Sequence, residues 1–135
     1  MKKGGVWLDK RMAYIVAVDD DNKDTVEIVV SKVEQRQEIL KAYRDKVKQG
    51  YAEKTKDRKL LEYNKHELKL YFKEILQQLV VFDEIVIYGP SQTAPKLFAE
   101  MKQLNPQLSL NVKEVLKANS MTKNQIRALI RDYYS

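Results

Sequence analysis

The chain has 135 residues, a net charge of +6 and no cysteine. This length allows one domain with its own core, and the lack of cysteine excludes disulfides, thiolate zinc sites and cysteine nucleophiles. The sequence contains no run of 18 apolar residues and no apolar signal segment at its start, so we expect a cytoplasmic protein without a membrane span.

Three strands are predicted in the first quarter of the chain. In the first, Val6 and Leu8 alternate with Trp7 and Asp9, and a tight turn follows. The second, Met12–Val18, is apolar on both faces, which is typical of a strand buried on two sides. A polar turn over residues 19–24 leads to the third, the β-branched run Thr25–Val33. Together they would form an antiparallel meander.

A basic segment follows these strands. Residues 41–59 contain 8 basic and 3 acidic side chains, whereas residues 1–40 contain 7 basic and 8 acidic. A local positive field suits an anionic partner, most often nucleic acid, although a solvated loop that needs charge for solubility would have the same composition. The domain is thus predicted to span residues 1–135 with a basic insertion at about 41–60.

The insertion supplies the candidate binding residues. Lysine and arginine can neutralise phosphates, and tyrosine can stack on unpaired bases. The predicted RNA-binding residues are Arg44, Lys46, Lys48, Tyr51, Lys54, Lys56, Arg58 and Lys59. Residues 44–60 offer few apolar anchors to offset the entropy of ordering, so we predict that they are disordered without a partner.

Helices and strands alternate in the rest of the chain. Asn64 and Glu67 have the spacing of a capping box, which predicts a helix that begins near Asn64 and ends near Phe82. The apolar run Glu84–Tyr88 predicts a central strand parallel to the first. A helix with Pro95 in its first turn should follow.

The last elements are predicted from an alternating run and a second capping box. Asn105 and Pro106 end the preceding helix, and the leucines and valines from Leu108 to Val115 predict a strand. Thr122 and Gln125 begin the final helix. The predicted fold is α/β of the ribonuclease H-like type, with a mixed five-stranded sheet, the order β-β-β-α-β-α-β-α and helices packed on the sheet.

We predict no catalytic, metal or cofactor site. A nuclease of this fold needs carboxylates that converge on two metals, and Asp9 has no matching carboxylate at the end of the strand over 84–88. The acidic turn over 19–24 lacks the glycine and distal glutamate of a calcium loop. The turn Gly89–Thr93 matches no phosphate-loop motif. His66 is the sole histidine and gives no serine triad.

Three short motifs resemble a known family. Gly5–Ala13, Asp83–Pro90 and Met121–Ile126 look like the landmarks of small bacterial proteins of the archaeo-eukaryotic release-factor-like group. That domain is similar to the middle domain of class-1 translation release factors and of the ribosome-rescue protein Pelota. The resemblance implies a role at the ribosome or on tRNA. Release factors of this kind hydrolyse peptidyl-tRNA with a Gly-Gly-Gln loop before the long helix, and this sequence contains no Gly-Gly-Gln.

The leading hypothesis is therefore a non-catalytic RNA-binding domain that associates with the ribosome, tRNA or another structured RNA. The alternative is a protein-interaction module, or a homo-oligomer, that docks on an acidic protein. A hydrolase that acts on peptidyl-tRNA through an unrecognised residue is the third hypothesis. Salt dependence separates the first two, because RNA binding weakens along a log-linear salt slope.

Overall fold

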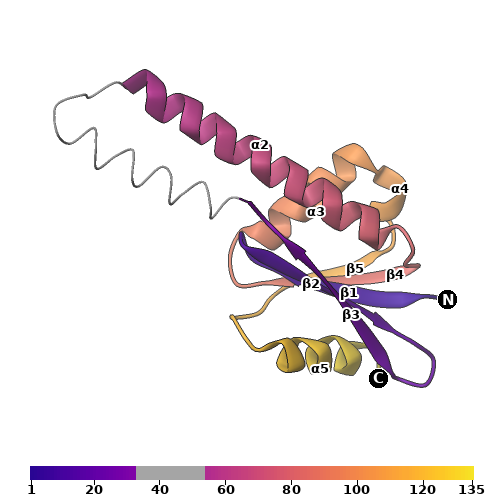
Figure 1. Ribbon diagram of the computed structural model, residues 1–135. Coiled ribbons are helices and arrows are strands. Elements are labelled where there is room, and N and C mark those ends of the chain that lie inside the picture. Colours follow the sequence, from indigo (N-terminus) through magenta and orange to yellow (C-terminus); the bar gives the residue numbers. More distant parts are fainter. Residues whose placement is uncertain (33–53) are drawn as a thin grey trace.

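The computed structural model describes residues 1–32 and 54–135, and within the second range it describes side chains from residue 64. Five strands form one mixed sheet in the order β3-β2-β1-β4-β5 (Figure 1). The central strand β1 pairs antiparallel with β2 and parallel with β4, as predicted. The strands are β1 Lys3–Leu8, β2 Met12–Val18, β3 Asp24–Val30, β4 Glu84–Gly89 and β5 Val112–Lys117. The predicted fold class is confirmed.

Helices cover both faces of this sheet (Figure 1). On one face lie α2 (Lys54–Leu79), α3 (Thr93–Leu104) and the short α4 (Pro106–Ser109), and on the other lies α5 (Lys123–Tyr134). Helix α5 begins with the predicted capping box: Thr122 Oγ1 accepts from the Gln125 amide, and the Gln125 side chain accepts from the Thr122 amide. The domain therefore has three layers.

Two apolar cores lie between these layers, one on each face of the sheet. The strand β2 contributes to both, since Ile15 packs beneath α2 and Val16 packs beneath α5. This confirms that Met12–Val18 is buried on two sides. The largest buried contributors to the α2 face are Leu8, Ile75, Leu79, Ile85, Ile87, Leu97 and Met101, and the α5 face is built from Trp7, Val16, Val18, Val86, Tyr88, Ile126 and Ile130.

The long helix begins earlier than its sequence predicts. Asn64 and Glu67 were expected to cap it, but α2 already begins at Lys54, so Asn64 lies in the helix interior. The expected boundary was wrong because residues 54–63 are rich in lysine, leucine, arginine and glutamate, which favour helix without a cap. Residues 54–60 are thus helical, and the predicted disorder over 44–60 was wrong for them. Residues 33–53 lie outside the described residues.

The segment before β5 also differs from its prediction. Leu108 was expected in the last strand, but it lies buried in α4. Asn105 caps this short helix, because its Oδ1 accepts from the Leu108 amide at 3.1 Å, and Pro106 occupies the first turn. The strand is therefore shorter and begins at Val112. Similarly, β3 ends at Val30 and not at Val33. Among the described helices, none has the length and apolar character needed to cross a membrane.

Candidate nucleic-acid interface

Helix α2 packs on the sheet through its C-terminal half. Among its described side chains, which start at Asn64, the buried ones are Glu67, Tyr71, Phe72, Ile75, Leu76 and Leu79. The N-terminal half projects beyond the sheet (Figure 1). At 1.5 Å per residue, Lys54 lies about 25 Å from Tyr71 along the helix axis. The fold thus presents the start of α2 away from both cores.

Tyr71 fixes the anchored half to the sheet. Its hydroxyl donates to the backbone oxygen of Asp9 at 3.0 Å, across the turn between β1 and β2. Burial, together with the charge of the Asp9 carboxylate, raises the pKa of Tyr71 well above its usual range. The hydroxyl therefore remains a neutral donor at any physiological pH. The projecting half of α2 is mounted on this fixed point.

The projecting end is strongly basic. Lys54, Lys56, Arg58 and Lys59 fall within the first six residues of α2, with Asp57 as the single acid among them. Successive residues turn by about 100°, so these four positions are distributed around the helix axis. A helix N-terminus carries the positive end of the backbone dipole, so cations there are unfavourable for the helix itself. The helix dipole does not account for this charge, whereas an anionic partner would be attracted to it.

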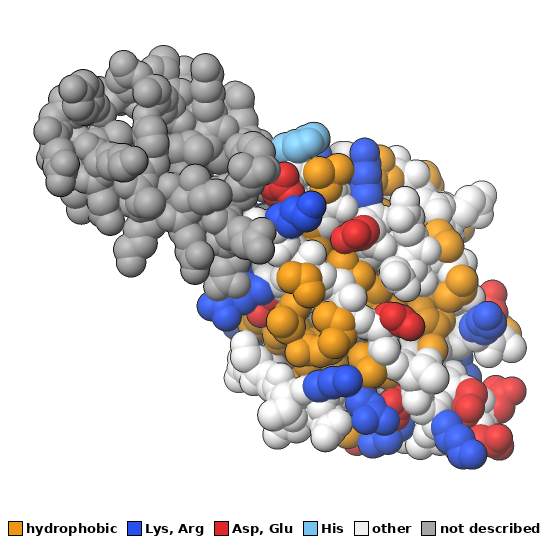
Figure 2. Space-filling model, viewed as in Figure 1, with side chains coloured by type: hydrophobic (Ala, Val, Ile, Leu, Met, Phe, Trp, Pro, Cys, Tyr) orange, Lys and Arg blue, Asp and Glu red, His pale blue; other side chains and the backbone are white. Residues whose placement is uncertain are grey.

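These four are the predicted binding residues that the structure places, and it brings them together on one helix end. The other four, Arg44, Lys46, Lys48 and Tyr51, lie outside the described residues. Within the described residues the rest of this side of the molecule is not basic. Figure 2 shows Lys and Arg side chains interspersed with Asp and Glu over the body of the domain.

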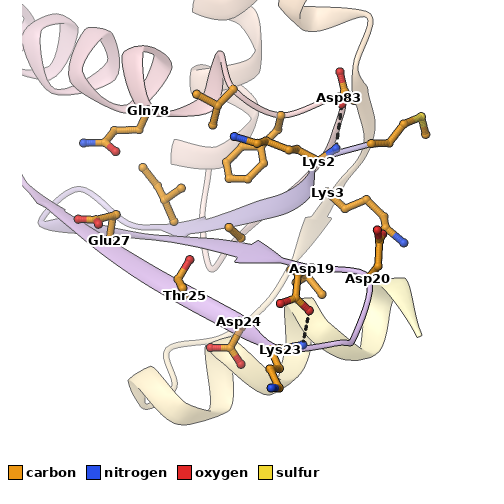
Figure 3. Close-up of a pocket in the computed structure, with 16 residues that line it drawn as sticks. Lys2, Lys3, Asp19, Asp20, Lys23, Asp24, Thr25, Glu27, Gln78 and Asp83 are labelled. Atoms are coloured by element: carbon orange, nitrogen blue, oxygen red, sulfur yellow. Dashed lines mark hydrogen bonds between the residues drawn. The ribbon is translucent and has the colours of Figure 1, made fainter.

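Two cavities lie between α2 and β3, and neither favours phosphate. The larger, of about 620 Å³, is lined by apolar residues that include Ile15, Ala17 and Phe82. At its rim lie the acids Asp19, Asp20, Glu27 and Asp83 and the lysines Lys2, Lys3 and Lys23 (Figure 3). The smaller, of about 410 Å³, is lined by both signs of charge, including Lys73 and Glu74. Sequence patterns did not predict these two cavities, because α2 and β3 come together only in the folded chain.

The acidic turn at this rim has a structural role. Asp19 Oδ1 accepts from the amides of Asp21 and Lys23, both at 2.9 Å, which closes the β2–β3 turn. Asn22 supplies the positive φ of 60° that the turn needs. Among the described residues, no three His, Cys, Asp or Glu side chains are grouped to hold a metal ion.

Asp9, the first candidate carboxylate for a nuclease, is likewise used by a turn. Its Oδ1 accepts from the amides of Arg11 at 2.8 Å and Met12 at 3.0 Å. The turn after β4 leads directly into α3, where Ser91 Oγ and the buried Thr93 Oγ1 lie 3.3 Å apart. Both arrangements satisfy backbone and side-chain groups at the ends of strands.

The fold is shared with known proteins. No protein-family model and no curated protein matches the sequence. Pelota from Archaeoglobus fulgidus is similar over 91% of this chain and 28% of its own, with 10% identity and a TM-score of 0.55. An archaeal translation termination factor is similar over 90% of this chain and 31% of its own, with 12% identity and a TM-score of 0.56.

This protein has the fold of one part of each. It spans less than a third of the length of either, so the likeness concerns the architecture of a single domain and not the whole of those proteins. The three short sequence motifs predicted a fold similar to that of release factors and Pelota, and the structural comparison agrees with this fold. The basic start of α2 projects beyond the sheet of this fold (Figure 1).

Proposed function

We propose that this protein is a translation-associated domain that binds the ribosome or tRNA and has no catalytic activity of its own. Two observations support the proposal. The fold is that of part of Pelota and part of a translation termination factor. The same fold carries a basic helix end whose charges the helix dipole does not favour.

The projecting half of α2 carries the proposal. A duplex or folded RNA presents closely spaced phosphates, and a cationic rod that stands away from the domain can approach them without a clash between the domain and the RNA. The four basic positions are spread over more than half of the helix circumference and the sequence contains no base-reading motif there, so we expect the helix to contact backbone phosphates and not particular bases. Binding of this kind depends on shape and on salt.

The non-catalytic part of the proposal rests on the sequence. Gly-Gly-Gln is absent from all 135 residues. Asp9 accepts two backbone hydrogen bonds in a turn, and its position close to Tyr71 suits a structural role. Incubation with a peptidyl-tRNA should therefore release no peptide, and multiple turnover would contradict this part of the proposal.

The deciding experiment is co-sedimentation with ribosomes at low and high salt. In one variant, four basic residues of α2 are each replaced with glutamate: Lys54, Lys56, Arg58 and Lys59. In a matched variant, four exposed lysines elsewhere are each replaced with glutamate: Lys10, Lys96, Lys102 and Lys123. Both variants have the same net charge, so a difference between them reports position. We expect the parent and the matched variant to co-sediment at low salt and the helix variant to remain in the supernatant.

A salt titration with purified tRNA gives the number of phosphates involved. If each of the four cations neutralises one phosphate, the log–log salt slope of the helix variant should be shallower by about 3 than that of the parent. Loss of co-sedimentation in both variants alike would contradict the assignment to α2. Association that survives nuclease treatment would instead favour an acidic protein partner.

A further inference from the structure

The outer edge of β3 is open. β3 is the first strand of the sheet order, and in the described part of the chain no strand pairs with its outer side. The Ser31 amide donates to the Arg11 oxygen at 2.7 Å, and the Asp19 amide donates to the Lys23 oxygen at 2.9 Å. Antiparallel pairing alternates, so the amides and carbonyls of Val26, Ile28 and Val30 point away from β2.

The residues of this edge whose backbone points outward, Val26, Ile28 and Val30, have apolar side chains. Ile28 pairs with Tyr14 and Val30 pairs with Met12, so both side chains lie on the α5 face of the sheet. Helix α5 covers the other end of this face, and Ile28 and Val30 are 48% and 63% exposed. Natural edge strands are usually protected by lysine, proline or a bulge. The outward-pointing positions Val26, Ile28 and Val30 have none of these.

The opposite face adds a further apolar contact beside the same edge. Leu70 on α2 is 44% exposed and lines the smaller cavity together with Val30. Lys73 and Glu74 follow on the same helix and line the same cavity. A surface that carries both signs of charge side by side can face its own copy across a two-fold axis, with each lysine towards a glutamate. The edge strand and the helix flank thus form one continuous surface.

We propose that this surface binds a second copy of the chain, with β3 pairing antiparallel to β3 of that copy and Ile28 opposite Ile28. The outward pattern Val26, Ile28, Val30 is symmetric about Ile28, so each valine meets a valine and every outward-pointing amide and carbonyl is paired. In this register Glu27 lies opposite Val29. The neighbouring register, centred on Glu27, would place two glutamates directly opposite each other, which is unfavourable.

The absence of cysteine makes this register directly testable. In the proposed pairing the two copies of residue 28 have Cα atoms about 5.5 Å apart, within the range that a disulfide bridges. The two copies of residue 30 lie about 14 Å apart, because each is two residues from the axis. Ile28→Cys should therefore form a disulfide-linked dimer under mild oxidation, and Val30→Cys, at a position that is more exposed to solvent, should not.

Sedimentation equilibrium provides the second measurement. The parent and Ile28→Val should dimerise as concentration rises towards about 1 mM. Ile28→Pro removes the outward-pointing amide that the dimer would use, so this variant should be monomeric. It should still fold, because proline is tolerated at a strand edge that faces solvent. Ile28→Lys should be monomeric as well and serves if the proline variant fails to fold by circular dichroism. Leu110→Lys, at an apolar residue that is 79% exposed elsewhere, should dimerise like the parent.

A parent that stays monomeric, with no preferential cross-linking at position 28, would overturn the proposal. Equal cross-linking at positions 28 and 30 would overturn it too, because that result indicates random collision. Dimerisation that persists in both Ile28→Pro and Ile28→Lys would place the interface elsewhere and would also contradict the proposal.

Discussion

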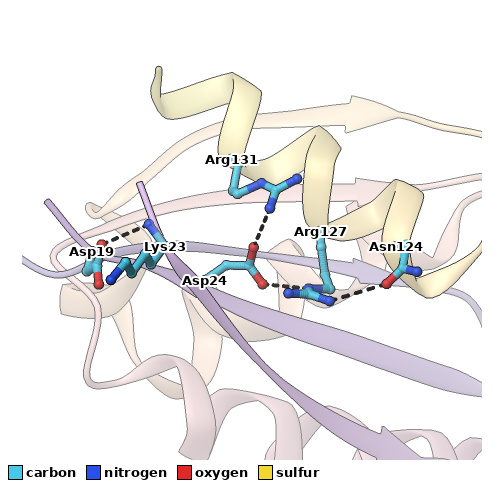
Figure 4. A network of polar contacts seen from close by, with 6 residues as sticks. All are labelled: Asp19, Lys23, Asp24, Asn124, Arg127 and Arg131. Carbon is cyan, nitrogen blue, oxygen red and sulfur yellow. Dashed lines mark hydrogen bonds and ion pairs between the residues drawn. The ribbon is translucent and has the colours of Figure 1, made fainter. Parts of the chain in front are cut away.

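Asp24 and Arg127 are 103 residues apart in the sequence, and Arg127 Nε lies 2.6 Å from Asp24 Oδ1 (Figure 4). Arg131 binds the second oxygen of the same carboxylate at 2.9 Å, and the Asp24 side chain is 1% exposed. Asp24 is the first residue of β3, whereas both arginines belong to α5. This pair of contacts joins the edge strand to the helix layer on that face.

Replacing Asp24 with asparagine should destabilise the domain. The substitution keeps the size of the side chain but leaves two guanidinium groups without their anion, at a cost of about 2 kcal/mol. Urea denaturation measures this loss in the free energy of unfolding. Asp20→Asn removes an exposed charge from the same turn and should change stability little. Equal effects of the two substitutions would show that the buried ion pair does not stabilise the fold.

Replacing Gly4 with alanine should strain the centre of the sheet. An added Cβ would lie 2.5 Å from Phe82 Cε1 and 2.6 Å from the Val16 oxygen, and the second of these is backbone that cannot rotate away. Overpacking of this kind costs about 1–3 kcal/mol. Thermal unfolding should show a lower Tm, and trimming the ring with a second substitution, Phe82→Leu, should not restore the parent value.

Stability should fall above pH 10 through Tyr133, a residue of α5. Burial, the hydrogen bond to Glu114 and the charge of that carboxylate raise the pKa of Tyr133 from 10.0 to about 12. Between these pH values the unfolded chain loses this proton while the folded chain keeps it, so the free energy of unfolding decreases as pH rises. Tyr133→Phe should flatten this part of the curve of unfolding free energy against pH.

Glu114→Gln tests the cause of that shift. The substitution removes the carboxylate charge that raises the pKa of both Tyr133 and Tyr88. Spectrophotometric titration of tyrosine absorbance should then show ionisation beginning at lower pH than in the parent. An unchanged titration curve would mean that burial alone holds these hydroxyls neutral.

The capping box of α5 should contribute measurably to stability. Thr122→Ala removes the side-chain acceptor of the Gln125 amide and should cost about 1 kcal/mol in urea denaturation. Thr122→Ser keeps the acceptor and should remain close to the parent. Similar losses in both variants would point to the threonine methyl group and not to the hydrogen bond.

Local sequence predicted the sheet well, because its signals are apolar runs between polar turns. Met12–Val18 was placed with its observed bounds, and its burial on both faces follows from its two apolar sides. The two capping-box patterns behave differently. Thr122 follows an irregular segment and caps α5, whereas Asn64 follows ten residues of helix. A four-residue pattern cannot show whether the chain before it is already helical.

The candidate interface was predicted in composition but not in form. Lys54, Lys56, Arg58 and Lys59 were recognised from charge, yet a disordered insertion was expected where they are carried on the start of α2. Leu60, Leu61 and Glu62 favour helix and would have indicated it. The edge position of β3 agrees with the predicted meander of the first three strands. The contact between Asp24 and Arg127 could not be predicted, because it joins residues 103 positions apart in the sequence.

The packing of the C-terminal half of α2 sets the position of its start. Tyr71, which donates a hydrogen bond to the Asp9 oxygen, lies about 25 Å from Lys54 along the helix axis. A tilt of the helix by about 10° at Tyr71 would therefore move its start by about 4 Å. Small adjustments in the packing beneath Tyr71 would therefore be amplified at the start of α2, so that residues far from any ligand could set where the charges are delivered.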